Sequence, residues 1–255
     1  MTLHACVTGA GSGIGAAITQ TLVENNFRVT LMGRRKDVLD QTANALGRSD
    51  LVHTIVCDVS DASGVQTAFT KAADPAGFGA IDVLVNNAGI APTAPFHKLN
   101  FEMWNSVMDV NLHGVFHCTQ AVLPGMRERR FGRIINIAST AAQKGYAYVS
   151  AYCAAKHAVL GLSRALALET AQQGITVNAV CPGFTDTDIV RSSITKIEAK
   201  TGRTASEVLA EFTSVNPQGR LVLPEEVANV VLWLCAKESG AITGQAISVS
   251  GGEVM

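Results

Sequence analysis

The chain lacks the features that mark secreted, membrane-spanning and nucleic-acid-binding proteins. Its six cysteines include no C-x-x-C pair, which indicates reduced thiols packed as small apolar residues. The 20 Lys and Arg residues are balanced by 21 Asp and Glu, so no basic excess attracts a nucleic acid. No apolar run is long enough to span a bilayer, and the first predicted strand begins too close to Met1 for a signal peptide. We therefore expect a cytoplasmic protein that binds neither nucleic acid nor membranes.

What the chain does have is a regular alternation of apolar segments. Hydrophobic residues make up 47% of the 255 residues and charged residues only 16%, which is typical of a packed globular protein. Apolar runs of strand length are each followed by an amphipathic stretch of helix length. The pattern predicts an α/β fold: a single doubly wound parallel sheet of about seven strands, with helices on both faces. The predicted strands are residues 3–8, 28–32, 51–57, 81–86, 133–139, 176–182 and 245–249.

The alternation runs from end to end without a linker or a repeat, so we expect one domain over residues 1–255. Residues 186–218 are more polar and less regular. They follow the carboxyl end of a predicted strand, where ligands bind in such sheets, and are therefore a candidate lid. The predicted helices 103–126 and 154–171 carry apolar residues on more than one face. Their outer faces predict coverage by further copies of the chain, in a homotetramer or a dimer.

A glycine-rich segment between the first predicted strand and the first predicted helix points to a phosphate-binding loop. Glycine permits a positive φ and a close approach of the backbone, and a helix N-terminus offers free N–H groups. A glycine cluster alone is weak evidence, but the first strand–helix crossover is where a dinucleotide binds in doubly wound sheets. The candidate cofactor-binding residues of this loop are Gly9, Ser12, Gly13, Ile14 and Gly15.

The end of the second predicted strand bears on the choice between NAD and NADP. An acidic residue about 20 residues beyond the glycine loop usually binds the free ribose 2′-OH of NAD. Here Gly33 is followed by Arg34, Arg35 and Lys36, and an Arg side chain can bind a 2′-phosphate through two hydrogen bonds. Cations at a helix N-terminus also oppose the helix dipole, which argues for a separate role. We therefore expect NADP(H) to be favoured over NAD(H), with Arg34 and Arg35 at the phosphate.

Tyr152 and Lys156 form the candidate catalytic pair. They stand four residues apart, so a helix would place both side chains on one face. The ordinary pKa of a tyrosine is about 10, and a nearby ammonium lowers that pKa by favouring the phenolate. A phenol tuned in this way can exchange a proton with the oxygen of a carbonyl or an alcohol. Of the three tyrosines, only Tyr152 has a lysine four residues later.

Further motifs accompany this pair along the chain, and their joint occurrence is highly specific. They are Thr8-Gly9-x-x-x-Gly13-Ile14-Gly15, Asn86-Asn87-Ala88-Gly89, Asn111, Ser139, Tyr152-x-x-x-Lys156 and Pro182-Gly183. On these residues the chain resembles the short-chain dehydrogenases/reductases from end to end, which implies a Rossmann-type fold. Within that family it is most similar to 3-oxoacyl thioester reductases, polyketide ketoreductases and 3-hydroxyacyl-CoA dehydrogenases. Residues 132–139 and 174–183 carry this closer likeness.

The resemblance implies a role for each of these residues. Tyr152 would donate and accept the proton, and Lys156 would lower its pKa and hold the ribose of the nicotinamide. Ser139 would bind the substrate oxygen, and Asn111 would hold a water that links Lys156 to solvent. The remaining cofactor-binding residues implied are Asp58 and Val59 by the adenine, Asn86 and Ala88 by the adjoining ribose with Gly89 next in the chain, and Pro182, Gly183, Thr185 and Thr187 by the nicotinamide.

The implied activity is the interconversion of a ketone and a secondary alcohol, with NADPH-dependent reduction of a 3-oxoacyl thioester or related β-keto compound as the leading interpretation. Two alternatives stay open. One is an NAD(P)-dependent dehydrogenase of a hydroxysteroid, sugar alcohol or aryl alcohol. The other is a non-catalytic module that senses the cofactor, although a sensor needs no tuned phenol. His113 and His117 have a spacing that can bind a metal, but no third ligand lies near them in the sequence, so we expect no metal site.

Overall fold

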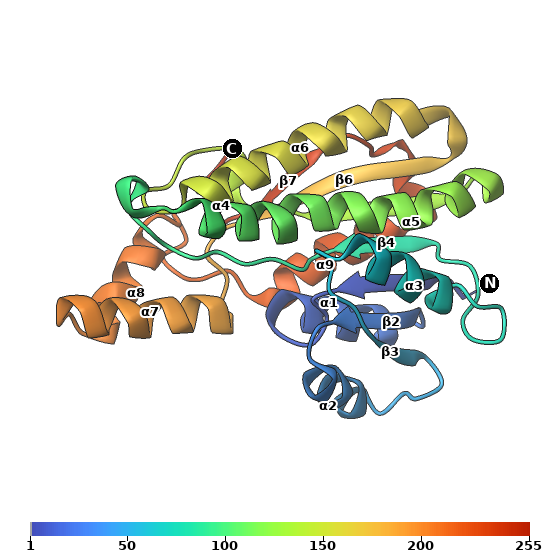
Figure 1. Cartoon of the computed structure of the whole chain (residues 1–255), viewed down its shortest axis with the longest axis horizontal. Helices are drawn as coiled ribbons and strands as arrows, with labels where there is room; N and C mark the ends of the chain where they lie inside the picture. The colour runs from blue at the N-terminus through green and yellow to red at the C-terminus, as the bar shows by residue number, and fades with distance from the viewer. Residues whose placement is uncertain (1) are drawn as a thin grey trace.

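Seven strands form one sheet in the order β3-β2-β1-β4-β5-β6-β7 (Figure 1). The structure is a computed structural model that describes residues 2–255. All neighbouring strands pair in parallel, which confirms the predicted fold class, and every predicted strand is present with slightly shifted ends. The strands are β1 (His4–Thr8), β2 (Arg28–Gly33), β3 (Val52–Val56), β4 (Val83–Asn86), β5 (Gly132–Ile137), β6 (Ile175–Pro182) and β7 (Ala246–Val249).

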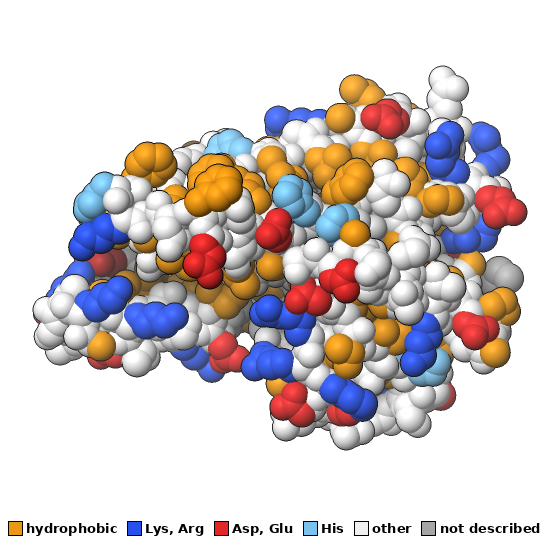
Figure 2. Space-filling view, in the orientation of Figure 1, with side chains coloured by type: hydrophobic (Ala, Val, Ile, Leu, Met, Phe, Trp, Pro, Cys, Tyr) orange, Lys and Arg blue, Asp and Glu red, His pale blue; other side chains and the backbone are white. Residues whose placement is uncertain are grey.

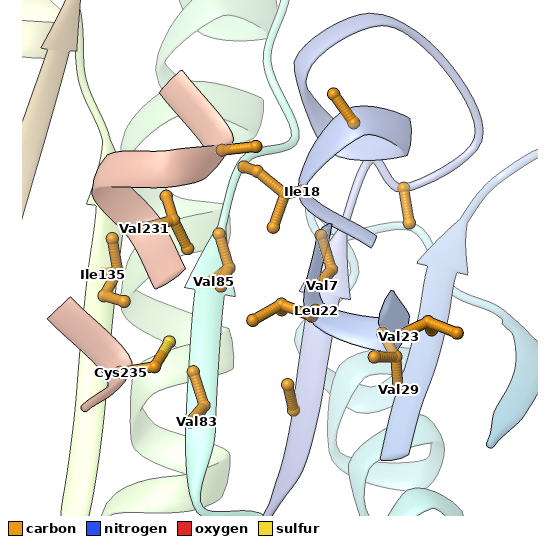
Figure 3. Close-up of a cluster of buried hydrophobic side chains, with 14 of the residues drawn as sticks. Val7, Ile18, Leu22, Val23, Val29, Val83, Val85, Ile135, Val231 and Cys235 are labelled. Carbon is orange, nitrogen blue, oxygen red and sulfur yellow. The ribbon is translucent and has the colours of Figure 1, made fainter. Parts of the chain in front are cut away.

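Helices cover both faces of the sheet. The helices that pack on it are α1 (Gly13–Glu24), α2 (Lys36–Leu46), α3 (Ala62–Ala72), α5 (Gly114–Arg129), α6 (Ser150–Thr170) and α9 (Pro224–Cys235). In β4, Val83 and Val85 belong to the buried cluster beneath α1 and α9, and Leu84 between them belongs to the cluster beneath α3, α5 and α6. Figure 3 shows the first cluster, with Ile18 of α1 and Val231 of α9 above the strands. Because successive side chains enter opposite cores, the strands read as continuous apolar runs.

The helix predicted over residues 103–126 is present in three parts. Helix α4 (Phe101–Met108) leads into a π-helical turn (Asp109–His113), which continues into α5. A π-helical turn of this kind inserts extra backbone into a helix and is frequent at functional sites. The helix predicted over residues 154–171 begins earlier, at Ser150, so α6 contains both Tyr152 and Lys156.

Residues 186–218 form a separate pair of helices at one end of the molecule, α7 (Asp188–Thr201) and α8 (Ala205–Ser214) (Figure 1). Thr204 and Glu207 begin α8 with a capping box, which satisfies N–H groups at the helix start. The surface is indented between this pair and the rest of the molecule (Figure 2). Within residues 2–255, no helix combines the length and the hydropathy that crossing a membrane requires. The six cysteines are free and buried, as the sequence predicts.

Candidate active site

The candidate residues follow the carboxyl ends of β1, β4, β5 and β6, which lie side by side in the sheet. Strand β1 pairs with β2 on one side and with β4 on the other, so the strand order reverses between β1 and β4. A reversal of this kind leaves a crevice above the strand ends, because the connections leave in opposite directions. The glycine loop after β1 and the Asn86–Gly89 segment after β4 stand at that crevice.

The glycine loop has the backbone that a phosphate site requires. Gly9 and Gly13 have φ of 64° and 51°, the left-handed region that favours glycine. A Cβ at Gly15 would lie 2.2 Å from the carbonyl oxygen of Gly9, so a side chain there would displace the loop. Ser12 is the N-cap of α1, its side chain makes no capping bond, and the first turn holds no acidic residue. The first N–H groups of α1 are therefore left for an anion, which fits the pyrophosphate of a dinucleotide.

Hydrogen bonds hold the loops after β1 and β4 together. The hydroxyl of Thr8 accepts from the backbone N–H of Asn87 at 3.0 Å and of Ala88 at 3.1 Å. The Asn87 amide donates in turn to the carbonyls of Thr8 and Gly9. From the sequence alone Asn87 has no expected role, although its place in the Asn86-Asn87-Ala88-Gly89 motif is the one signal that could have marked it. Asn87 is therefore the residue that orders the two loops of the crevice.

The side chains of Asn86 and Asn111 form hydrogen bonds with other groups of the protein. The Asn86 amide donates to Asn136 Oδ1 at 2.8 Å and to Thr119 Oγ1 at 3.3 Å. Its side chain is thus turned into the core, which leaves only its backbone for the adenine-side ribose that the sequence assigns to it. Asn111 lies fully buried in the π-helical turn and bonds the backbone of Ile90 in both directions. A Cβ at Gly89 would lie 2.8 Å from Asn111 Oδ1, so Gly89 and Asn111 abut.

Tyr152, Lys156 and Ser139 converge as the sequence predicts. The Lys156 Nζ lies 5.5 Å from the centre of the Tyr152 ring and donates to the Ile137 carbonyl at 2.7 Å. Lys156 has no second acceptor among residues 2–255, so two of its three N–H groups are free for ribose hydroxyls. Ser139 is the N-cap of a short 3₁₀ helix (Thr140–Ala142), where its Oγ accepts from the Ala141 N–H at 3.1 Å. Its own proton is not used in this contact and points to the Tyr152 phenol, with which Ser139 forms a hydrogen bond.

Burial is the main influence on the protonation states of Tyr152 and Lys156. Burial, the largest effect, raises the pKa of Tyr152 to about 12, and a hydrogen bond with Ser139 offsets part of the rise. Burial lowers the pKa of Lys156 to about 8. The sequence predicts that Lys156 lowers the tyrosine pKa. In the protein without cofactor the loss of solvent outweighs any such effect, so Tyr152 is a neutral proton donor at neutral pH.

The segment after β6 closes the far side of the crevice. Thr185 is buried, and its hydroxyl donates to the Gly183 carbonyl at 3.0 Å. Thr187 is the N-cap of α7 without a capping bond, and a Cβ at Gly13 would lie 3.0 Å from its Cγ2. The glycine loop and the start of α7 therefore touch, which brings Pro182, Gly183, Thr185 and Thr187 to the same site as the loop.

At the other end of the crevice, Arg34 and Arg35 are exposed at the start of α2. Lys36 pairs with Asp40, whereas neither arginine has a carboxylate partner among residues 2–255. Asp58 accepts from the N–H and hydroxyl of Ser60, and the carbonyl of the neighbouring Val59 contacts His117 Nδ1 at 3.0 Å.

The chain is similar to known proteins along nearly its whole length. A family model described as short chain dehydrogenase matches residues 3–198. An acetoacetyl-CoA reductase of Shinella zoogloeoides is 40% identical over 253 residues, covering 99% of both chains. An acetoacetyl-CoA reductase of Rhizobium meliloti shows the same identity and coverage. The crystal structure of an actinorhodin polyketide ketoreductase variant with NADPH matches with a TM-score of 0.94 at 38% identity, covering 99% of this chain and 97% of that one.

Proposed function

The chain belongs to the short-chain dehydrogenase family, and from this we propose that it reduces the keto group of a 3-oxoacyl thioester to a secondary alcohol. It is an NAD(P)-dependent oxidoreductase. The observation that carries the substrate class is the agreement between the site and the relatives. Ser139, Tyr152 and Lys156 stand together beside a dinucleotide loop, and relatives that match nearly the whole chain are named for β-keto thioester reduction.

In this mechanism each residue acts on the ketone oxygen or on the cofactor's position. A bound reduced nicotinamide supplies the hydride that the carbonyl carbon receives. Ser139 donates a hydrogen bond to the carbonyl oxygen and keeps its proton, an interaction whose loss costs on the order of 3 kcal/mol. Tyr152, protonated at neutral pH, gives its proton to the same oxygen as negative charge develops there. Lys156 offers its two free N–H groups to the ribose hydroxyls, which holds the nicotinamide beside Tyr152. We assign residues 186–218 the role of a substrate lid.

The direct test is NADPH oxidation by the purified protein with acetoacetyl-CoA, beside a panel of keto steroids, keto sugars and aryl ketones. We expect the highest kcat/KM with the β-keto thioester, because that substrate both accepts the hydride at its keto group and fills the site for the acyl thioester. A higher kcat/KM for one of the other ketones would replace this substrate class. Cofactor binding without turnover of any ketone would favour the sensing module.

We also propose that NADPH is the preferred cofactor. Replacing Arg34 by Ala is expected to raise the KM for NADPH by about tenfold, the cost of one charge-assisted hydrogen bond, while the KM for NADH stays unchanged. The matched control is Arg48→Ala, because Arg48 is equally exposed but pairs with Asp50 at 3.1 Å. A wild-type kcat/KM that favours NADH, or an Arg34→Ala variant that behaves as the Arg48→Ala variant does, contradicts the assignment.

We further propose that the protein is a homo-oligomer, a tetramer or a dimer, in the cytoplasm. Large apolar side chains are exposed on the helices whose outer faces suggested an interface, among them Phe101 on α4, Phe116 on α5 and Leu168 on α6. Several hydrophobic side chains lie along the α4–α5 side in Figure 2. Burial of such side chains by another copy is favourable because each removes apolar area from water. Sedimentation velocity at micromolar concentration tests this, and a stable monomer would contradict it. The six reduced cysteines support the cytoplasmic location.

A further inference from the structure

Glu253, the third residue from the end of the chain, carries a buried carboxylate that the mechanism does not use. Its side chain is only 1% exposed. The Tyr146 phenol donates to its Oε1, and the Lys144 Nζ lies 3.0 Å from the same oxygen. Its Oε2 has no hydrogen-bond partner among residues 2–255 and lies against Gly183, where a Cβ would come within 2.8 Å. Burying a carboxylate costs free energy, so this arrangement calls for a reason.

The carboxylate is connected to the catalytic end of β5 through Tyr146. The phenol oxygen of Tyr146 also lies 2.6 Å from the hydroxyl of Thr140, the neighbour of Ser139. A phenol carries one proton, which goes to Glu253, so Thr140 is the donor in the second bond. Burial, and after it the bond to Glu253, raises the pKa of Tyr146, which keeps the phenol protonated. The ring of Tyr146 is thus fixed beside Ser139.

Tyr146 also begins a row of aromatic side chains that reaches the lid. Its ring meets Phe184 edge to face, with centres 5.9 Å apart and planes at 83°. Phe184 in turn packs on Phe212 of α8 at 4.7 Å. Edge-to-face and tilted pairs of this kind have a preferred geometry, so a fixed Tyr146 constrains the rings that follow it. The row runs from Tyr146 through Phe184, the residue after Gly183, to Phe212 of α8 in the proposed lid.

The end of the chain is itself held in place. Gly251 and Gly252 have φ of 61° and 95°, and the Glu253 N–H donates to the Ser250 carbonyl at 3.2 Å, which forms a tight turn. A Cβ at Gly251 would overlap the Asn216 amide, so the turn packs directly on the segment that follows α8. Tyr146, which Glu253 binds, lies four residues before the start of α6 at Ser150. The tail therefore contacts both the Tyr146 loop and the end of the lid.

We propose that Glu253 is a positioning residue that fixes Tyr146 as a wall of the space occupied by the substrate, and that Tyr146 thereby limits the bulk of the ketones that reach Ser139 and Tyr152. The proposal rests on the proposed function, because it refers to the same ketone site. Glu253 acts through Tyr146 and takes no part in the proton transfer. The carboxylate is suited to this role because it binds the phenol and the Lys144 ammonium at once.

The test compares Glu253→Gln, Tyr146→Phe and the double variant with the wild type. Each single change removes the charge-assisted bond and is expected to raise the KM for acetoacetyl-CoA by about tenfold, with the KM for NADPH and kcat within about twofold. Since both changes remove the same bond, the double variant is expected to match the worse single one. Tyr146→Ala is expected to raise kcat/KM for a bicyclic ketone such as 1-tetralone relative to acetoacetyl-CoA. Glu225→Gln is the matched control, because Glu225 is exposed at the start of α9.

Hydrogen exchange of the protein without cofactor supplies a readout that needs no turnover. Glu253→Gln is expected to speed exchange in residues 143–149 and 208–217 and to leave α1 and the strands unchanged, whereas Glu225→Gln changes neither region. Exchange in Glu253→Gln equal to the wild type, or faster exchange everywhere with a lower Tm, overturns the positioning role. Multiplicative KM losses in the double variant overturn it as well. A wild type that fails on acetoacetyl-CoA refutes the proposed function alone, since the exchange pattern and the kcat/KM of Tyr146→Ala for 1-tetralone relative to that of the wild type still decide this inference.

Discussion

Replacing Tyr152 by Phe is expected to lower kcat for ketone reduction by about 10³-fold while the Kd for NADPH stays within about twofold. The phenol is the only proton donor that the mechanism places on the ketone oxygen apart from Ser139, and a phenylalanine ring cannot replace it. The packing of the ring is retained, because the ring packs against the buried apolar cluster of Val107, Ala151 and Ala155. Single-turnover kinetics with acetoacetyl-CoA and a fluorescence titration with NADPH measure the two quantities separately.

Tyr148→Phe is the control for this variant. Tyr148 is 65% exposed and lies four residues before Tyr152, so the same chemical change is made on a solvated phenol. We expect its kcat to equal that of the wild type. If Tyr152→Phe retains near-normal turnover, the proton comes from another group and the proposed mechanism is wrong. If it loses NADPH binding instead, Tyr152 acts mainly in holding the cofactor.

Replacing Lys156 by Met is expected to abolish most turnover and, at the same time, to stabilise the protein without cofactor at neutral pH. Burial lowers the Lys156 pKa from 10.5 to about 8. Below pH 8 the folded protein therefore carries the ammonium charge in a buried site, whereas the unfolded chain carries the same charge in water. A shift of this size corresponds to at most about 3 kcal/mol of lost stability. Methionine fills a similar volume without the charge, but it leaves the Ile137 carbonyl without its donor, at a cost of about 1 kcal/mol. The net gain is therefore about 2 kcal/mol at pH 7.

The pH dependence checks the sign of this effect. Between the folded pKa of about 8 and the ordinary value of 10.5 the unfolded chain binds more protons than the folded one. Wild-type stability from this group therefore rises across that window, and the advantage of Lys156→Met shrinks. Urea unfolding at pH 7 and pH 10 measures both, with Lys71→Met on the exposed side of α3 as the control. A Lys156→Met variant less stable than the wild type at pH 7 would show that burial does not disfavour the ammonium.

The predictions that the sequence supports best concern features that a short segment determines. The four central strands β1, β4, β5 and β6 are recognisable because each is buried along its whole length and reads as a largely apolar run. The glycine loop is recognisable because positive φ at Gly9 and Gly13 is a local requirement of the backbone. Tyr152 and Lys156 lie on one face of α6 because helix geometry alone places residues four apart together.

The contacts that the sequence could not predict join residues far apart in the chain. Asn86 stands in a motif that suggests cofactor contact, yet its amide is bound by Asn136, which is 50 residues away. Tyr146 and Glu253 are 107 residues apart, and no spacing rule relates a residue near the end of the chain to the loop that follows Ser139. Asn111, in the π-helical turn, likewise donates to the carbonyl of Ile90, which comes from the loop after β4.

By itself, then, the sequence determined the order of the elements, the position of the glycine loop and the candidate residues Ser139, Tyr152 and Lys156, which the structure brings together. The first two follow from backbone geometry and residue type within a few positions. Only the tertiary structure decided the protonation of those residues and the contact between Tyr146 and Glu253. The pKa of Tyr152 lies above its ordinary value rather than below it because desolvation depends on the elements packed around the phenol, and a lysine one turn away does not determine that packing.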